Sequence, residues 1–134
     1  MKRRLILALA ALAGAYAAPA SAQSTGVRLA CSAAGAQDFS MDARYEDRRG
    51  RRKFDASFEA APNLGFVAGQ RIDVSVGGVK VGQMILARDP ANGDIAGDLE
   101  FDTRRDEGNP FPANFPNVTR GTSIVVGSLG CALN

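Results

Sequence analysis

Residues 71–79 read Arg-Ile-Asp-Val-Ser-Val-Gly-Gly-Val, and this stretch decides the fold class. Ile72, Val74 and Val76 alternate with polar residues, so their side chains point to one face of an extended strand. The Gly-Gly pair at 77–78 follows at once, and glycine reaches the positive φ angles that a two-residue hairpin turn requires. The stretch therefore predicts a strand, a tight turn and an antiparallel partner strand.

The same alternation recurs through the chain after residue 26, most regularly over residues 95–103. Turn sequences separate the alternating segments at residues 89–94 and 127–128. Val81 and Met84 break the alternation, and a β-bulge near Gly82 would reconcile them. About eight short strands with turns between them are typical of an all-β fold, an antiparallel β-sandwich or barrel.

Two irregular connections are predicted within this fold. Residues 46–52 form a charged connection between the second and third strands, and residues 104–117 form a surface loop. The loop contains Pro110, Pro112 and Pro116, which cannot donate hydrogen bonds to a sheet.

The first 22 residues have the organisation of a secretory signal peptide. Met-Lys-Arg-Arg precedes an apolar run of 14 residues, from Leu5 to Ala18, and small residues stand at Ala20 and Ala22. A membrane-spanning helix needs roughly 20 apolar residues, so we expect cleavage after Ala22 rather than an anchor. Residues 23–134 would then form a single β domain, periplasmic or secreted, with no transmembrane anchor.

Removing the signal peptide changes the sign of the net charge. The formal charge of +2 comes from 16 basic and 14 acidic residues, and three of the basic residues are Lys2, Arg3 and Arg4. The mature chain would carry 13 basic and 14 acidic residues, a formal charge of −1. We therefore expect no general polyanion-binding surface and no nucleic-acid partner.

Cys31 and Cys131 are the only cysteines, and they lie near the two ends of the mature chain. In an exported protein such a pair predicts a disulfide bond. The loop that it closes spans 100 residue steps. Loop-closure entropy gives about 4.7 kcal/mol of stabilisation for a loop of that size. The alternative, a redox-active or nucleophilic thiol, has no C-x-x-C spacing and no histidine to support it.

The most basic local run contains Arg48, Arg49, Arg51, Arg52 and Lys53. These residues are candidates for binding an anionic partner such as lipopolysaccharide or an acidic glycan. The simpler interpretation is a solvated hairpin tip, partly neutralised by neighbouring carboxylates, that also discourages pairing at the sheet edge. We favour the simpler interpretation.

Asp98, Glu100 and Asp102 alternate with apolar residues and are predicted to line the outer face of one strand. Hard cations such as calcium bind carboxylates, so this row is a candidate for a calcium site. An EF-hand loop beginning at Asp89 would need glycine at its sixth position, and Asp94 stands there instead. The spacing therefore does not match an EF-hand. We predict a solubilising face, paired across strands with Arg71 or Lys80.

Phe111 and Phe115 stand in the proline-rich loop and are candidates for contact with a partner. The alternative, which we favour, is that both rings fold back over an open end of the core.

An enzyme is not expected, because the chain has no histidine and its acidic residues are placed on an exposed face. We expect no catalytic residues, no cofactor and no metal site.

Three segments carry a resemblance: residues 43–59, residues 71–82 and residues 111–127, which ends in T-R-G-T-S-I-V-V-G. The chain resembles small exported bacterial β domains in which a V-N-G-x-x-V-G hairpin is followed by a G-x-G-x-L strand. Gly77 stands where those domains usually have Asn, and the following strand reads N-G-D-I-A-G-D-L. The resemblance covers most of residues 41–127 and implies a fold and an exported location, with no activity attached.

Two functions remain on this basis. One is an exported, non-catalytic β domain with a structural or adhesive role, whose partner is an envelope or extracellular protein or glycan. The alternative is a binding module for an anionic component of the cell envelope, acting through residues 48–53.

Overall fold

The structure, a computed structural model, describes Gly14, residues 26–104 and residues 106–134. These residues form nine strands and no helix, so the predicted all-β class is confirmed. The signal peptide predicted for residues 1–22 lies outside the described residues, apart from Gly14. The strands are β1 (Val27–Ala34), β2 (Phe39–Arg48), β3 (Arg51–Ala60), β4 (Arg71–Val76), β5 (Val79–Ile85), β6 (Ala87–Arg88), β7 (Ile95–Asp102), β8 (Ser123–Val126) and β9 (Leu129–Ala132).

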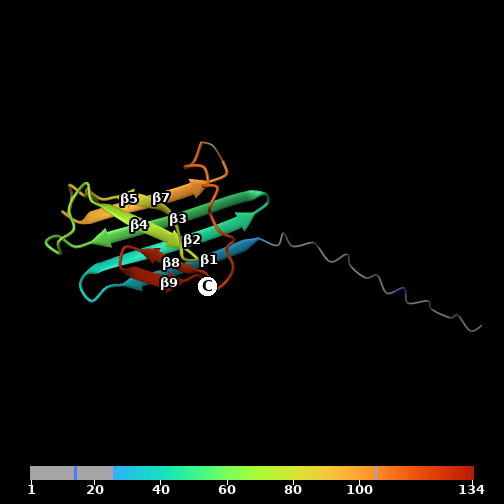
Figure 1. The fold of residues 1–134 in the computed structure, drawn as a ribbon, viewed down its shortest axis with the longest axis horizontal. Coiled ribbons are helices and arrows are strands. Elements are labelled where there is room, and N and C mark those ends of the chain that lie inside the picture. Colours follow the sequence, from blue (N-terminus) through green and yellow to red (C-terminus); the bar gives the residue numbers. More distant parts are fainter. Residues whose placement is uncertain (1–13, 15–25, 105) are drawn as a thin grey trace, which may run out of the picture.

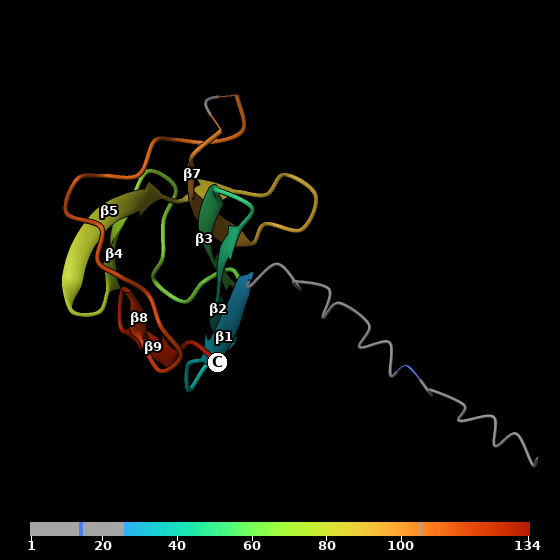
Figure 2. The ribbon, with the colours of Figure 1, turned by 90° about the vertical axis from the view of Figure 1, so that its right-hand side faces the viewer.

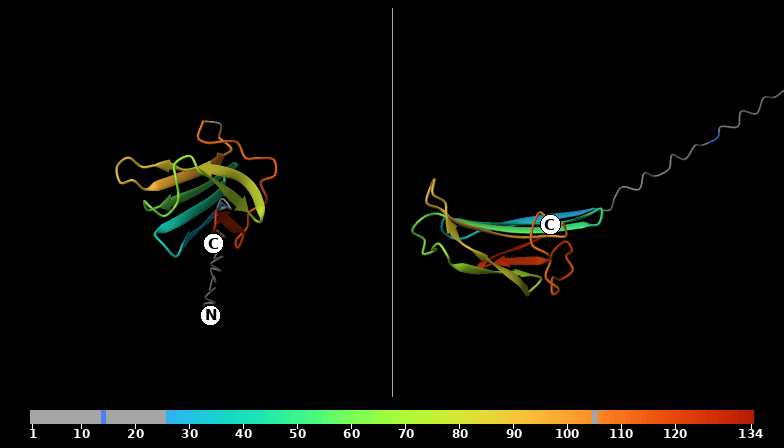
Figure 3. Two further views of the ribbon diagram at one scale, coloured as in Figure 1. Left: turned by 60° about the vertical axis from the view of Figure 1, so that its left-hand side comes forward. Right: turned by 90° about the horizontal axis from the view of Figure 1, so that it is seen from above.

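The strands form two sheets in which every pairing is antiparallel. One sheet has the order β1-β2-β3-β7-β6 and the other has the order β5-β4-β8-β9 (Figure 1). Seen end-on, the two sheets face each other across the core (Figure 2). The view from above shows them as two layers, which is an arrangement consistent with a β-sandwich (Figure 3).

The alternating apolar residues supply the core, as predicted. Phe54, Val74 and Ile124 are completely buried, and their neighbours of the same parity are buried or half-buried. Every strand except the two-residue β6, both of whose residues are exposed, therefore contributes one face to the space between the sheets and one face to solvent.

Predicted turns and the predicted bulge are also present. Val76 pairs with Val79 across Gly77 and Gly78, both of which have positive φ. The register of β4 and β5 shifts so that Val81 has no partner, next to Gly82. Val81 and Met84 can therefore both be buried although their spacing breaks the alternation.

The two sheets are connected along both sides. On one side the chain leaves β5 and enters β6 through the buried Leu86, whose backbone N–H donates to Gln70. On the other side Ala30 of β1 exchanges two backbone hydrogen bonds with Asn134. The predicted disulfide between Cys31 and Cys131 is present beside them, with Cα atoms 5.8 Å apart.

The charged connection predicted for residues 46–52 is wrong in its extent. β2 runs to Arg48 and β3 begins at Arg51, so only Arg49 and Gly50 form the turn. Both turn residues have positive φ, which allows a two-residue hairpin. Arg51, Arg52 and Lys53 therefore lie on a strand and point alternately to its two faces.

Candidate functional site: the basic end of the five-stranded sheet

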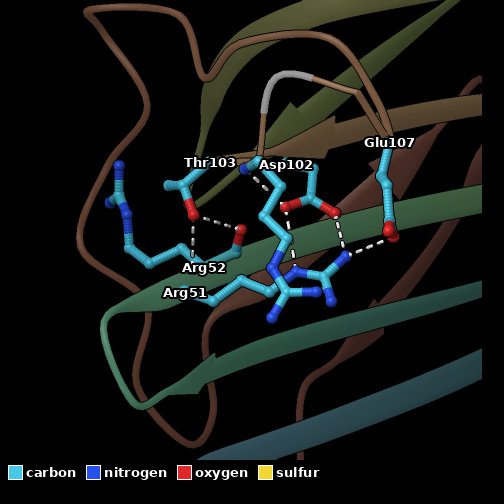
Figure 4. A network of polar contacts seen from close by, with 6 residues as sticks. Arg51, Arg52, Asp102, Thr103 and Glu107 are labelled. Atoms are coloured by element: carbon cyan, nitrogen blue, oxygen red, sulfur yellow. Dashed lines mark hydrogen bonds and ion pairs between the residues drawn. The ribbon is translucent and has the colours of Figure 1, made fainter.

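A buried ion pair lies at the end of the sheet where β2 turns into β3 (Figure 4). Arg51 donates to both carboxylate oxygens of Asp102, over 3.1 Å and 2.5 Å, and to Glu107 over 2.8 Å. The Asp102 side chain has no exposed surface, whereas that of Arg51 is 28% exposed. Two parallel hydrogen bonds of this kind fix both partners in orientation as well as in charge.

The ion pair shifts the pKa values of both partners. The Arg51 guanidinium and the backbone N–H of Arg104 hold the pKa of Asp102 at about 2. The hydrogen bond from Arg51 to Asp102 likewise raises the pKa of the guanidinium above its usual range. Both groups therefore stay charged at neutral pH, so this pair can bind charge but is not suited to proton transfer near neutral pH.

The prediction that Asp102 lines an exposed acidic face with Asp98 and Glu100 is wrong, because its side chain is buried. The chain turns back after β7, and Asn109 exchanges backbone hydrogen bonds with Glu100 and Asp102. The returning segment lies over Asp102, and a Cβ atom built on Gly108 would be 3.2 Å from the Cβ atom of Asp102. Glycine at 108 thus permits the close approach that buries the carboxylate.

The predicted cross-strand partners of the acidic strand are also wrong. Arg71 and Lys80 belong to the other sheet, where Lys80 pairs with Asp73 at 3.1 Å. Asp102 instead lies opposite Lys53 in the register of β3 and β7 and pairs with Arg51.

Arg52 points to the other face of β3, toward the proline-rich loop. Its guanidinium carbon lies 4.4 Å from the centre of the Phe111 ring, which is a cation–π contact. The backbone N–H of Arg52 donates to the Thr103 hydroxyl over 3.0 Å, and the backbone N–H of Thr103 donates to the carbonyl of Arg52 over 3.0 Å (Figure 4). These contacts attach the start of the loop to the end of β3.

The five predicted anion-binding residues are thus brought to one end of the sheet but do not form one surface. Arg51 is engaged by two carboxylates, Arg52 covers Phe111, and Lys53 is half-buried on the outer face. Arg48 and Arg49 are exposed and form no ion pair within 4.0 Å with any described residue. Those two arginines are the members of the run that can reach a ligand directly.

Phe111 and Phe115 fold back onto the core, as the favoured interpretation predicts. The centre of the Phe115 ring lies 5.4 Å from that of Phe54 and 5.9 Å from that of Phe101. Phe111 packs edge-on against Phe115, with ring centres 4.8 Å apart. Both rings are half-buried, so the loop closes this end of the core with aromatic side chains.

The pairing of carboxylates from the loop and from β7 with Arg51 was not predicted from the sequence. Glu107 and Asp102 neutralise Arg51, although they lie more than 50 positions away in the chain. Nothing in the local pattern distinguishes Asp102 from Asp98. The only available signal was the Gly-Asn-Pro sequence at 108–110, which indicates a tight return of the chain.

Among the described residues, no three Asp, Glu, His or Cys side chains are grouped so that they could hold a metal ion. No helix within residues 26–104 or 106–134 is long and apolar enough to cross a membrane.

No family model of known proteins matches the chain, and searches of curated proteins and of solved structures likewise gave no match.

Proposed function

We propose that this chain is an exported, non-catalytic β domain with a structural or protein-interaction role. In this proposal residues 1–22 are a cleaved signal peptide, and residues 23–134 form a single β-sandwich domain in the periplasm or outside the cell. The observation that carries the proposal is the disulfide between Cys31 and Cys131. Disulfides form and persist in oxidising compartments, and they are rare in the cytosol.

The use of the chain's reactive side chains supports a role without catalysis. Both cysteines are in the disulfide, the ion pair of Arg51 and Asp102 is held charged, and the loop phenylalanines are packed on the core. The outer face of the five-stranded sheet carries exposed charges of both signs. Such a surface suits recognition of another protein, because complementary charges guide and orient association.

Export is tested by expressing the full 134-residue chain in a Gram-negative host and measuring the intact mass of the protein in each cell fraction. We expect the periplasm or medium to contain a chain that begins at Gln23 and lacks the two thiol hydrogens. As a matched control, Ala20→Leu with Ala22→Leu should block cleavage and leave residues 1–22 attached. A cytoplasmic protein with both thiols reduced would overturn the proposal.

The interaction role is tested by pull-down from intact envelope with the oxidised protein as bait. We expect a defined protein or glycan to be retained, and a chain with its disulfide reduced serves as the comparison. Failure to retain any component would contradict an adhesive role and leave a purely structural one.

A second candidate function is binding of an anionic envelope component through residues 48–53. The exposure of Arg48 and Arg49, without an ion pair among the described residues, favours it. Arg48→Ser with Arg49→Ser should weaken binding to lipopolysaccharide vesicles, and wild-type binding should fall steeply as salt rises. Arg71→Ser, an exposed arginine on the other sheet, is the control. Unchanged binding by the double variant would reject this function.

A further inference from the structure

A hollow of about 370 Å³ lies at the edge of the five-stranded sheet, between the start of β1 and residues 118–120. Two arginines line it, Arg28 and Arg120, and no carboxylate side chain does. Its volume is at the lower end of the range for small-molecule sites, so it suits a small ligand or the headgroup of a larger one. The other lining residues are Gly26, Val27, Leu29, Val118 and Thr119.

Both arginines are held in place and still have donors to spare. Arg120 donates to the side-chain oxygen of Asn134 over 3.2 Å and forms no ion pair within 4.0 Å with a described residue. The Nε atom of Arg28 contacts a carboxylate oxygen of Glu46 at 2.5 Å. Because a guanidinium has five N–H donors, each of these side chains can bind a further anion.

Arg48 supplies a third guanidinium next to the hollow. A Cβ atom built on Gly26 would lie 2.6 Å from Cγ and 3.0 Å from Nε of Arg48. The Arg48 side chain therefore extends from β2 across Gly26, which is one of the residues that line the hollow. It is exposed and has no ion pair within 4.0 Å among the described residues, so it is available at the rim.

Positive side chains outnumber negative ones around this hollow. Glu46 and Asp47 are the carboxylates at the adjoining end of β2, and neither of them lines the hollow. Three guanidinium side chains against two carboxylate side chains leave a formal charge of +1, which favours an anionic ligand.

The backbone of β1 adds an uncharged donor. Ala30 exchanges two backbone hydrogen bonds with Asn134, so its N–H and C=O groups point away from β2. Because this direction alternates from residue to residue along a strand, the N–H of Arg28 points the same way. That N–H has no backbone acceptor among the described residues, and it lies on the side of β1 where the hollow opens.

One wall of the hollow is apolar. Val27 is 39% exposed, although it is a large hydrophobic residue, and Val118 is half-buried against the core. A ligand that fills the hollow would cover Val27, so an apolar part beside the anionic group would gain from burial.

We propose that this hollow binds the phosphate group of an organic phosphate whose carbon chain lies against Val27. The guanidiniums of Arg28, Arg48 and Arg120 come from three separate segments and can approach one anion from different sides. A phosphate has three or more acceptor oxygens and can accept hydrogen bonds from all of them, whereas a carboxylate has only two oxygens. A lipid headgroup and a soluble phosphate ester share this chemistry.

The inference rests on the second candidate function, and it places the site at the edge of β1 with Arg48 as the only member of the basic run. It is tested with oxidised protein purified from expression of the full 134-residue chain. One arm is isothermal titration with inorganic phosphate and with glycerol 3-phosphate. The other is co-sedimentation with phosphatidylcholine vesicles that contain or lack phosphatidic acid.

Arg120→Gln should weaken binding in the arm that shows it by about fivefold or more, the loss expected for one exposed charge contact. The matched control is Arg71→Gln, which removes an exposed arginine from the other sheet and should leave binding unchanged. Val27→Ser should weaken binding to phosphatidic acid vesicles but not to inorganic phosphate. Equal effects of Arg120→Gln and Arg71→Gln would overturn the inference.

Nuclear magnetic resonance gives a measurement that needs no variant. In the ¹⁵N-labelled wild type, saturating glycerol 3-phosphate or short-chain phosphatidic acid should shift the backbone amide signal of Arg28 downfield, because a phosphate oxygen becomes its acceptor. An Arg28 signal that stays in place while another part of the chain responds would place the ligand elsewhere and overturn the inference.

The two arms also identify the source of the phosphate. Binding in both arms supports a site open to soluble phosphate esters, and binding to vesicles alone supports a lipid headgroup. Binding in neither arm, or binding to lipopolysaccharide that depends on Arg49 and not on Arg120, overturns the inference. In the latter case the second candidate function stands, whereas a chain that binds no anion at all overturns both.

Discussion

At the end of the five-stranded sheet beside the β2–β3 turn, the buried carboxylate of Asp102 pairs with Arg51. At the opposite end, the exposed side chains of Asp42, Glu59 and Asp98 form no ion pair within 4.0 Å with a described residue. Arg51 lowers the pKa of Asp102 to about 2, and Asp94 raises that of Glu59. The two ends are otherwise similar, because each closes the core with phenylalanine rings. Phe54, Phe101, Phe111 and Phe115 close the basic end, and Phe39, Phe58 and Phe66 close the acidic end.

The difference teaches that packing and charge have separate roles in this fold. Aromatic contacts close both ends of the core, so stability does not require the acidic end to be electrostatically satisfied. Residues left in an unfavourable state where the rest of the fold is consistent are often used for function. The carboxylates of the acidic end are therefore candidates for a contact, and the ion pair of Arg51 and Asp102 at the basic end serves stability.

The largest effect is expected from the aromatic packing at the basic end. Phe115→Ala removes a half-buried ring that touches Phe54, Phe101 and Tyr45, and it should lower the free energy of unfolding by about 2–3 kcal/mol. Phe111→Ala should have a smaller effect, since that ring lies farther out under Arg52. Urea unfolding with the disulfide intact measures both. An unchanged midpoint for Phe115→Ala, together with lost association, would instead indicate a partner contact.

The next effect is expected from the ion pair. Asp102→Asn leaves Arg51 without its charged partner in a buried site, and it should lower the melting temperature by about 5 °C or more. Asp98→Asn, on the same strand but exposed, is the matched control and should change it by less than about 2 °C. Equal effects at the two positions would remove the distinction between the two ends.

Much of the fold followed from alternation, but the pairing of Asp102 did not. Strands such as β7 and turns such as Gly77-Gly78 are local features, so periodicity and backbone conformation predict them. The parity of Asp102 assigns it to the solvent face, and only the return of the loop at Asn109 covers it. The two-residue strand β6 is likewise fixed by pairing with distant residues. Contacts between residues so far apart in the chain leave no local pattern in the sequence.

A third effect should appear as a pH dependence. The ordinary pKa of Asp in an unfolded chain is about 3.9, and that of folded Asp102 is about 2. A lowered pKa contributes stability that is present above pH 4 and lost as the pH falls through 2. The difference in melting temperature between wild type and Asp102→Asn should therefore be largest near pH 7 and shrink toward pH 2. A constant difference would show that packing, not charge, makes the contribution.

The smallest change in melting temperature is expected from removing one carboxylate at either end of the sheet, and it should be positive at the acidic end and negative at the basic end. Glu59→Gln removes a carboxylate whose pKa is raised by Asp94, so it should raise the melting temperature at pH 7 by about 1–2 °C. Because a raised pKa means that the folded state binds the proton more tightly, wild-type Glu59 gains the same relief on protonation, and the advantage should vanish near pH 3. Glu107→Gln is the counterpart at the basic end, where it removes an ion pair with Arg51 and should lower the melting temperature slightly. If both variants shifted the melting temperature in the same direction, the carboxylates at the acidic end would not destabilise the fold by mutual repulsion.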